Sequence, residues 1–77
     1  MNLDEVLSGQ TCKILSVNAD AKLLQKLLDM GFVPGAQIEV VREAPFKDPM
    51  ELKIHNYLIS LRKSEATLIK VEPCQNR

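Results

Sequence analysis

The sequence has few aromatic residues and no excess of charge. Among its 77 residues there is no tryptophan, one tyrosine and two phenylalanines, so aliphatic side chains must fill most of the core. No run approaches the roughly 20 apolar residues that a membrane-spanning helix requires. Ten basic residues cancel ten acidic ones, whereas duplex DNA and anionic membrane surfaces both attract a surplus of Lys and Arg. These absences favour a single globular domain over residues 1–77, without nucleic acid or membrane insertion.

The chain also lacks the features of a secreted or metal-stapled protein. Its acidic start, Met1-Asn-Leu-Asp-Glu-Val6, has neither the basic nor the apolar region of a signal peptide, so we expect a cytoplasmic protein. Cys12 and Cys74 are then reduced thiols. Together with His55 they stand apart in sequence, whereas a closed zinc site uses four Cys or His ligands in close pairs. We therefore predict no metal site.

One helix is predicted over residues 21–30, where apolar residues recur at helical spacing. Asp20 is its predicted N-cap, because a carboxylate there accepts hydrogen bonds from the first free amides. Polar residues occupy the opposite face of the helix. The predicted apolar stripe consists of Leu23, Leu24, Leu27 and Leu28.

The end of this helix is the best-specified part of the sequence. Gly31 suits the left-handed position that follows many helices, and Phe32 comes next, where it can contact Leu27. Pro34 and Gly35 then fit the two central positions of a type II turn, since proline presets φ and glycine accepts a positive φ. The sequence predicts a helix, a Schellman-type stop and a tight turn in succession.

The remaining chain has the period of β-strands. Predicted strands cover residues 12–17, 37–42, 50–54, 57–61 and 67–71, with Ile38 and Val40 facing inward in the second. The first strand breaks its alternation at Ile14-Leu15, which predicts a bulge. Residues 44–49 carry two prolines and form a loop. Five short strands with a helix after the first predict a mainly β, small SH3-like barrel, because an OB-fold places its helix later.

Two short helical turns, a polar tail and a hairpin turn complete the prediction. Residues 2–7 form a helical turn capped by Asn2, with Leu3, Val6 and Leu7 on one side. Ser64 caps a second short turn, and the chain from Pro73 onward is a polar tail. A two-residue turn at His55-Asn56 sets a hairpin register that pairs Ile54 with Tyr57, Leu52 with Ile59 and Met50 with Leu61, all six facing the core.

No arrangement of residues indicates catalysis. The serines and cysteines have only His55 as a base, and Gly9, Gly31 and Gly35 match no phosphate-binding loop. We predict no catalytic residues and no cofactor. A ferrous site with His55 and Glu51 or Asp48 is conceivable, but a solvated turn is the better interpretation of His55. Single-stranded nucleic acid is disfavoured because lysines alternate with acidic residues and because Phe32 and Tyr57 are assigned to the core.

A protein-binding surface remains open. Five apolar residues fall where the alternation of strands and helix leaves their burial undecided. Each alone favours the core, whereas as a set they permit a docking patch. They are Leu24, Leu28, Val41, Leu58 and Leu68.

The motifs resemble those of the FeoA family of ferrous iron transport proteins. Leu27-Leu-Asp-Met-Gly-Phe-Val-Pro-Gly35 resembles the family signature, and the later motifs agree in order and spacing across most of the chain. Lys47 and Asn56 stand where the family often has glycine. The later motifs are Ile38-x-Val40, Ala44-Pro-x-x-Asp-Pro49, Leu58-Ile-Ser-Leu-Arg62, Glu65-Ala66 and Ile69-x-Val71.

The resemblance implies an SH3-like barrel that serves the FeoB membrane transporter and its cytosolic GTPase domain, as an accessory protein peripheral to the inner membrane. Related modules end iron-dependent repressors, which leaves a metal-sensing or general interaction module as the alternative. Weak self-association stays open. We expect the partner-binding residues at the helix end and its turn, where a capped helix displays an apolar ridge: Leu24, Leu28, Met30, Gly31, Pro34 and Gly35.

Overall fold

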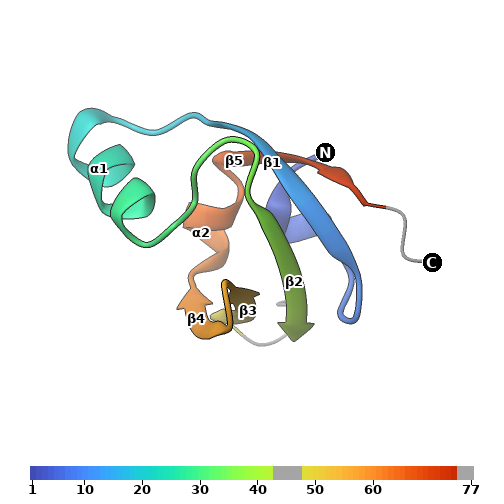
Figure 1. Cartoon of the computed structure of the whole chain (residues 1–77). Helices are drawn as coiled ribbons and strands as arrows, with labels where there is room; N and C mark the ends of the chain where they lie inside the picture. The colour runs from blue at the N-terminus through green and yellow to red at the C-terminus, as the bar shows by residue number, and fades with distance from the viewer. Residues whose placement is uncertain (43–47, 75–77) are drawn as a thin grey trace.

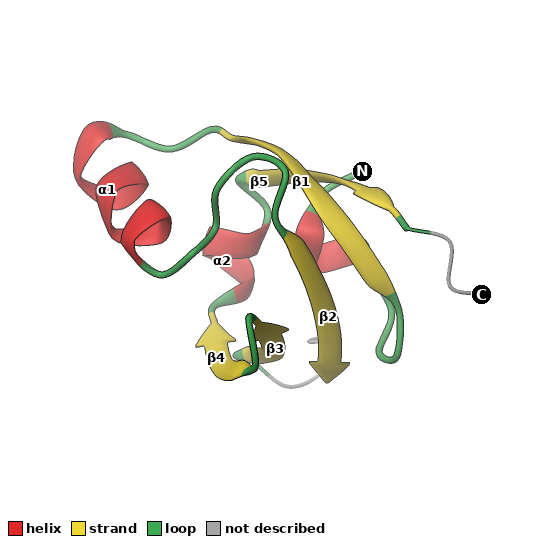
Figure 2. Cartoon of the chain, in the orientation of Figure 1, coloured by secondary structure: helices red, strands yellow, loops and turns green. Residues whose placement is uncertain are grey.

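A five-stranded antiparallel sheet curls around an aliphatic core in the computed structural model, which describes residues 1–42 and 48–74. The strand order is β4-β3-β2-β1-β5, and helix α1 stands to one side of the sheet (Figures 1 and 2). The elements are the 3-10 turn η1 (Leu3–Glu5), β1 (Thr11–Val17), α1 (Ala21–Asp29), β2 (Gln37–Arg42), β3 (Met50–Ile54), β4 (Tyr57–Leu61), α2 (Lys63–Ala66) and β5 (Ile69–Pro73).

The predicted bulge lies in β1. The register of β1 against β5 shifts between Ile14 and Ser16, and the side chain of Leu15 between them is 44% exposed. A bulge bends its strand and increases the local twist. This bend lets β1 pair with β2 on one side and β5 on the other, so one strand joins both halves of the sheet.

The core draws on every strand and on the segment that follows α1. Phe32 is its largest member and is fully buried, as are Leu27 of α1, Leu3 of η1 and Ala66 of α2. No polar side chain is fully buried in the described ranges. Each large aliphatic side chain contributes about 1.5–3 kcal/mol on burial, so the barrel rests on apolar packing. The strand residues of the core are Cys12, Ile14, Ile38, Val40, Met50, Leu52, Ile54, Leu61, Ile69 and Val71.

The hairpin of β3 and β4 has the predicted register but not the predicted burial. His55 and Asn56 both have positive φ, as a type I′ turn requires. The three predicted pairs are all present. However, Tyr57 is 70% exposed, so its assignment to the core was wrong, and Ile59 is only half-buried. Tyr57 directly follows the turn, at the end of the hairpin, and none of the described residues covers its ring.

The short elements differ from prediction at their ends. Leu7 is 57% exposed and does not join Leu3 and Val6 in the core, because the chain turns away after η1. Helix α2 begins at Lys63, so Ser64 is not its cap. Instead the Lys63 amide donates to Asp48 Oδ1 at 2.8 Å, a contact between distant parts of the sequence.

The last strand runs later than predicted. Thr67 still belongs to the end of α2, since its amide donates to the Lys63 carbonyl. Pro73 pairs with Cys12 inside β5 and is not part of a tail. Of the predicted loop over 44–49, only Asp48 and Pro49 lie in the described ranges, and Lys47 lies outside them.

Candidate functional site

The predicted helix stop is present in full. Gly31 has φ +105°, and its amide donates to the Leu28 carbonyl at 3.0 Å. The Phe32 amide donates to the Leu27 carbonyl at 3.0 Å. These two hydrogen bonds define a Schellman motif. Because Leu27 and Phe32 are both fully buried, the stop also fixes the helix end against the barrel.

The turn after the stop is attached to β1. The Ala36 amide donates to the Val33 carbonyl at 3.0 Å, and Gly35 has φ +92°, as a type II turn around Pro34 and Gly35 requires. The Gly35 amide then donates to the Ile14 carbonyl at 2.8 Å, and the Ile14 amide donates to the Ala36 carbonyl at 2.9 Å. Pro34 and Gly35 are therefore exposed on a turn whose backbone is held by the sheet.

Helix α1 itself is only lightly anchored. Its N-cap is the predicted Asp20, whose Oδ1 accepts from the Leu23 amide at 2.9 Å. Leu27 is its one fully buried residue among the nine from Ala21 to Asp29. Lys26 Nζ lies 3.3 Å from Glu65 Oε2 of α2, an ion pair with a mostly exposed lysine. The helix is thus held by its two ends, by the buried Leu27, by this ion pair and by Leu23, which packs against the core while partly exposed.

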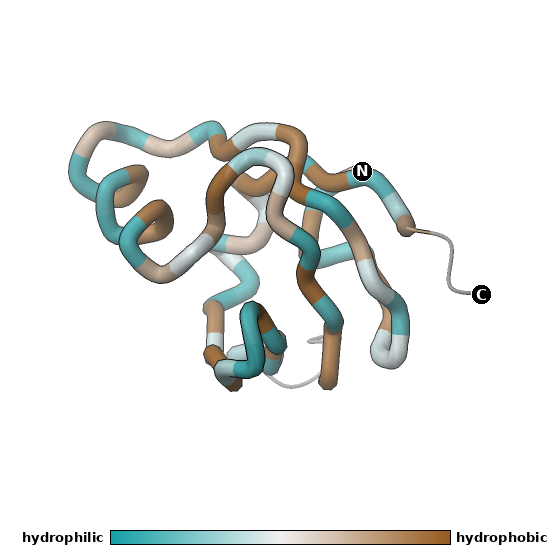
Figure 3. Tube along the Cα trace, in the orientation of Figure 1, coloured by the Kyte–Doolittle hydropathy of each residue, from teal (hydrophilic) through white to brown (hydrophobic). Residues whose placement is uncertain are grey.

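The rest of the apolar stripe is half-buried. Leu24, Leu28 and Met30, predicted as partner-binding residues, each keep part of their surface in solvent, and so does Leu23. Figure 3 shows brown apolar positions alternating with teal polar ones around this helix. A capped helix that leaves an apolar stripe half-covered can receive an apolar element of another protein.

A shallow depression adds Leu23 to the candidate surface. It has a volume of about 510 Å³ and is lined by Asp20, Lys22, Leu23 and Lys26. Leu23 belongs to the predicted apolar stripe but not to the predicted partner-binding residues. One feature of the sequence indicates that Leu23 belongs to the candidate surface: Lys22 and Lys26 flank it and place positive charge beside an apolar side chain.

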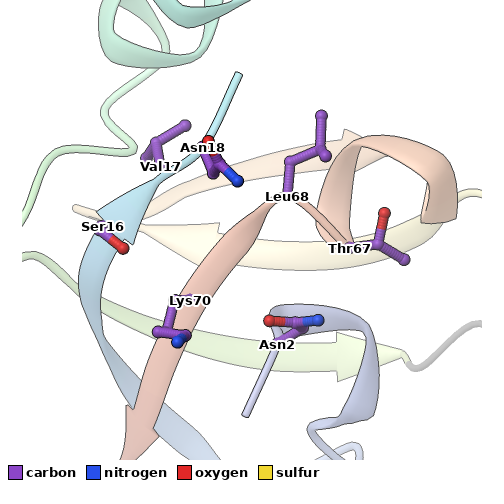
Figure 4. Close-up of a pocket in the computed structure, with 7 residues that line it drawn as sticks. All are labelled: Asn2, Ser16, Val17, Asn18, Thr67, Leu68 and Lys70. Atoms are coloured by element: carbon purple, nitrogen blue, oxygen red, sulfur yellow. The ribbon is translucent and has the colours of Figure 1, made fainter.

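A second depression, of about 410 Å³, lies where β1 and β5 run side by side (Figure 4). Lys70 is the one charged residue in its lining, and no carboxylate, histidine or cysteine contributes to it. The lining therefore offers hydrogen bonds but no acid–base pair and no metal ligand set. The lining residues are Asn2, Ser16, Val17, Asn18, Thr67, Leu68 and Lys70.

The five undecided apolar residues do not gather into one patch. Leu24 and Leu28 lie on α1, whereas Val41 and Leu58 lie on β2 and β4 and are 43% and 73% exposed. Leu68 lines the second depression instead. Only the pair on α1 belongs to the candidate site.

The cysteines and the histidine do not form a metal centre. Within residues 1–42 and 48–74, no three His, Cys, Asp or Glu side chains gather closely enough to hold a metal ion. His55 is exposed at the hairpin turn. Cys12 and Cys74 are free thiols, and burial raises the pKa of Cys12 to about 11, with a smaller contribution from the nearby Cys74. A thiol with this pKa stays protonated near neutral pH and is a poor ligand and nucleophile.

No described helix is both long and apolar enough to cross a membrane.

Comparison with known proteins identifies relatives over nearly the whole chain. Residues 1–73 match the family model of the FeoA domain. A curated relative from Porphyromonas gingivalis, an Fe(2+) transport protein A/Fe(2+) transporter FeoB fusion protein, is 39% identical over 72 residues, or 94% of this chain. The chain spans only 8% of the length of that fusion protein.

Solved structures have the same fold. The iron(II) transport protein A of Clostridium thermocellum is 45% identical, with a TM-score of 0.88 over 95% of this chain and 45% of that one. FeoA of Stenotrophomonas maltophilia, solved with zinc and described as a prokaryotic SH3 domain protein, is 26% identical, with a TM-score of 0.83 over 94% of this chain and 89% of that one. The predicted SH3-like fold is thereby confirmed.

The predicted relation to metal-dependent repressors is also seen, at the level of fold. A manganese-dependent transcriptional repressor superposes with a TM-score of 0.86 at 19% identity, over 95% of this chain and 40% of that one.

Proposed function

The chain belongs to the FeoA domain family of ferrous iron transport, and we propose that it is a non-catalytic accessory protein that docks on the FeoB transporter and regulates it. The observation that carries this proposal is the Porphyromonas gingivalis relative, in which a FeoA region and FeoB share one chain. Joining two modules raises their effective concentration, which benefits a pair that must meet to function. We infer that the FeoA domain of this chain likewise meets a FeoB transporter.

The proposed docking surface is the apolar stripe of α1 together with the stop and turn that follow it. Leu24, Leu28 and Met30 supply half-exposed apolar area. Gly31, Pro34 and Gly35 contribute through the backbone conformation that holds the helix end against the barrel. A helix face on a fixed base loses little conformational freedom on binding, which favours affinity.

The charges beside the stripe support a partner segment with acidic and apolar residues. Lys22 and Lys26 border the depression at Leu23, and both are exposed. An amphipathic segment of FeoB could place apolar side chains on the stripe and a carboxylate near the Lys22 ammonium group, since Lys26 already pairs with Glu65. Such docking places the protein in the cytoplasm, next to the inner membrane.

Regulation requires that the affinity differ between transporter states. A ligand shifts a two-state equilibrium only by its differential affinity for the two states. We therefore propose titration calorimetry of this protein against the cytosolic GTPase domain of FeoB, loaded first with GDP and then with a non-hydrolysable GTP analogue. Saturable binding that differs between the nucleotides supports a regulator, and equal binding supports a scaffold. No heat at micromolar concentrations contradicts docking on this domain.

The docking surface is tested with Leu28→Gln and its matched control Leu7→Gln. Leu28 is half-buried, so the substitution costs about 1 kcal/mol of stability, and a thermal melt verifies that the fold persists. Binding is expected to weaken at least about tenfold, or 1.4 kcal/mol. Leu7 is 57% exposed, lies outside the surface and leaves binding unchanged. Unchanged binding by a folded Leu28→Gln variant contradicts the site.

The alternative, a free-standing metal sensor, makes a different prediction. It requires stoichiometric binding of ferrous or zinc ions that is lost in His55→Ala. Since the described residues supply no three-ligand cluster, we do not propose it.

A further inference from the structure

The two edge strands of the sheet differ in how they are protected. Strand β5 contains Lys70, Glu72 and Pro73, and it carries an extra bridge from Asn2 to Lys70. Strand β4 reads Tyr-Leu-Ile-Ser-Leu and has no charged residue and no proline. Charges and proline are the usual means by which an edge strand is kept from pairing with another chain. Edge β4 has neither.

The free backbone groups of β4 are those of Leu58 and Ser60. In a hairpin with a two-residue turn, the residues that flank the turn exchange hydrogen bonds, so Ile54 and Tyr57 form such a pair. The alternation then directs the amide and carbonyl groups of Ile59 and Leu61 toward β3 and those of Leu58 and Ser60 away from it. Within the described part of the chain, no strand pairs with β4 on that outer side.

The side chains of this edge are unusually apolar. Tyr57 and Leu58 are 70% and 73% exposed, the highest values among the exposed large hydrophobic residues. They lie on opposite faces of the strand, because successive side chains alternate. Ile59, the central residue of β4, is half-buried and packs against the core.

We propose that β4 pairs antiparallel with β4 of a second copy of this chain, with Ile59 on the two-fold axis. In that register, Leu58 of each copy lies opposite Ser60 of the other, and each of these pairs exchanges backbone hydrogen bonds. The two residues with outward groups are symmetric about Ile59, so the edge is complementary to itself without any change of register.

The neighbouring side chains fit this two-fold pairing. On the face that packs on the core, Ile59 lies opposite Ile59 of the second copy, and Tyr57 lies opposite Leu61 of the second copy. The partly exposed apolar surface of one copy therefore continues into that of the other. On the outer side, the row of Lys53 and Leu58 continues into Ser60 and Glu51 of the second copy. Each row then begins with a positive side chain and ends with a negative one.

The overall charge does not oppose this association. Ten basic and ten acidic residues leave a formal net charge of zero, so two copies do not repel each other at long range. The edge of β4 therefore fits a second copy of this chain. It does not fit a charged partner strand, because β4 has no charged side chain to pair with it.

The association is measured by sedimentation of the whole protein over a range of concentrations. We expect a reversible monomer–dimer equilibrium that Leu58→Pro weakens at least about tenfold. Its ring removes an amide that points away from β3, so the hairpin is retained. Leu58→Lys serves as a second variant, and Leu7→Lys is the matched control that leaves association unchanged. A protein that stays monomeric throughout overturns the proposal, as does a dimer that both Leu58 variants leave intact.

The register is tested by cross-linking under mild oxidation in a Cys74→Ser background. Ile59→Cys places two thiols opposite each other across the axis, in a pair without mutual hydrogen bonds, where the strands come closest. We expect a disulfide-linked dimer, formed as the two thiols pass two electrons and two protons to one oxidised glutathione, which becomes two molecules of reduced glutathione. Ser60→Cys, whose thiol faces Leu58 of the other copy, forms it far more slowly. Equal rates for the two variants overturn the register.

Discussion

The barrel and helix α1 belong to one small chain, yet different interactions hold them. In the barrel, apolar side chains from all five strands are fully buried. Helix α1 buries only Leu27 completely and otherwise depends on the partly buried Leu23, its N-cap, its Schellman stop and one ion pair. The barrel is therefore stabilised by cooperative burial, whereas α1 is stabilised by a few local bonds whose effects can be separated.

The difference bears on where binding takes place. Elements with few buried contacts open locally at a lower free energy than the core, and binding elements are drawn from that group. The candidate docking residues lie on such an element, while its base at Phe32 lies in the core. A partner can thus contact α1 without disturbing the packing of the barrel.

The strongest test removes the residue that connects the two regions. Phe32→Ala deletes the largest core side chain and is expected to lower the free energy of unfolding by about 3–5 kcal/mol. Chemical denaturation measures it. Val33→Ala is the control, because Val33 is 39% exposed and should cost well under half as much. Similar losses for both would mean that the helix base is not part of the barrel core.

The barrel alone is tested through Cys12. Since burial raises the pKa of this thiol to about 11, the native state holds its proton more tightly than the unfolded state does. The stability that this thiol contributes is complete below its unfolded pKa of 9.0 and is lost as pH rises toward 11, by up to about 1.4 kcal/mol per pH unit. Urea midpoints between pH 8 and pH 10.5 measure this slope. Cys12→Ala should flatten it, and an unchanged slope would assign it to other groups.

The junction between the regions is tested at Gly31. Gly31→Ala forces a side chain into φ +105° and brings its Cβ to 3.4 Å from Ile54 Cγ2. We expect a loss of about 1–2 kcal/mol, mainly from the backbone conformation. Gly9→Ala, at φ +87° with no atom within 4 Å of the added Cβ, is the matched control without the contact. The difference between the losses of stability of the two variants, measured by thermal melts, gives the contribution of the contact between the helix end and Ile54.

The independence of α1 is tested at its N-cap. Asp20→Ala removes the acceptor of the Leu23 amide and should cost about 1 kcal/mol. Hydrogen exchange is expected to quicken at the amides of α1 and to change little in β3. Asp29→Ala, at the other end of the helix, is the control. Equal acceleration in β3 would show that the helix and the barrel open as one unit.

The smallest effect is expected from the ion pair between α1 and α2. Lys26→Met and Glu65→Gln, combined in a double-mutant cycle, should give a coupling of about 0.2–1 kcal/mol that falls with added salt. Glu65→Gln is chosen because its remaining oxygen can still accept from the Arg62 amide, as Glu65 Oε1 does at 3.3 Å. A coupling that does not respond to salt would contradict an electrostatic contact.

Features that depend on neighbouring residues could be predicted from the sequence. The Asp20 cap, the stop at Gly31 and the His55-Asn56 turn follow from local backbone chemistry, and the turn fixes the register of β3 and β4. Features that depend on distant residues could not. The contact of the Lys63 amide with Asp48 at the start of α2 and the exposure of Tyr57 on the core-side face of its strand are two such features.

The candidate site divides in the same way. The stop and turn were placed correctly because they are local. The half-burial of Leu24 and Leu28 depends on how far the barrel extends beneath the helix, which periodicity does not contain. The depression at Asn2 and Lys70 joins the two ends of the chain, and no motif indicated it.

The attachment of the turn to Ile14 has a consequence for how this protein can diversify. The chain leaves β1 at Val17, forms α1, and returns to the same strand, where the Gly35 amide and the Ala36 carbonyl bond to Ile14. Departure and return are thus adjacent, and lengthening a loop whose ends are already held together costs little conformational entropy. The segment that contains α1 can therefore be shortened, lengthened or replaced by another sequence, while the strands on either side of it keep their pairing.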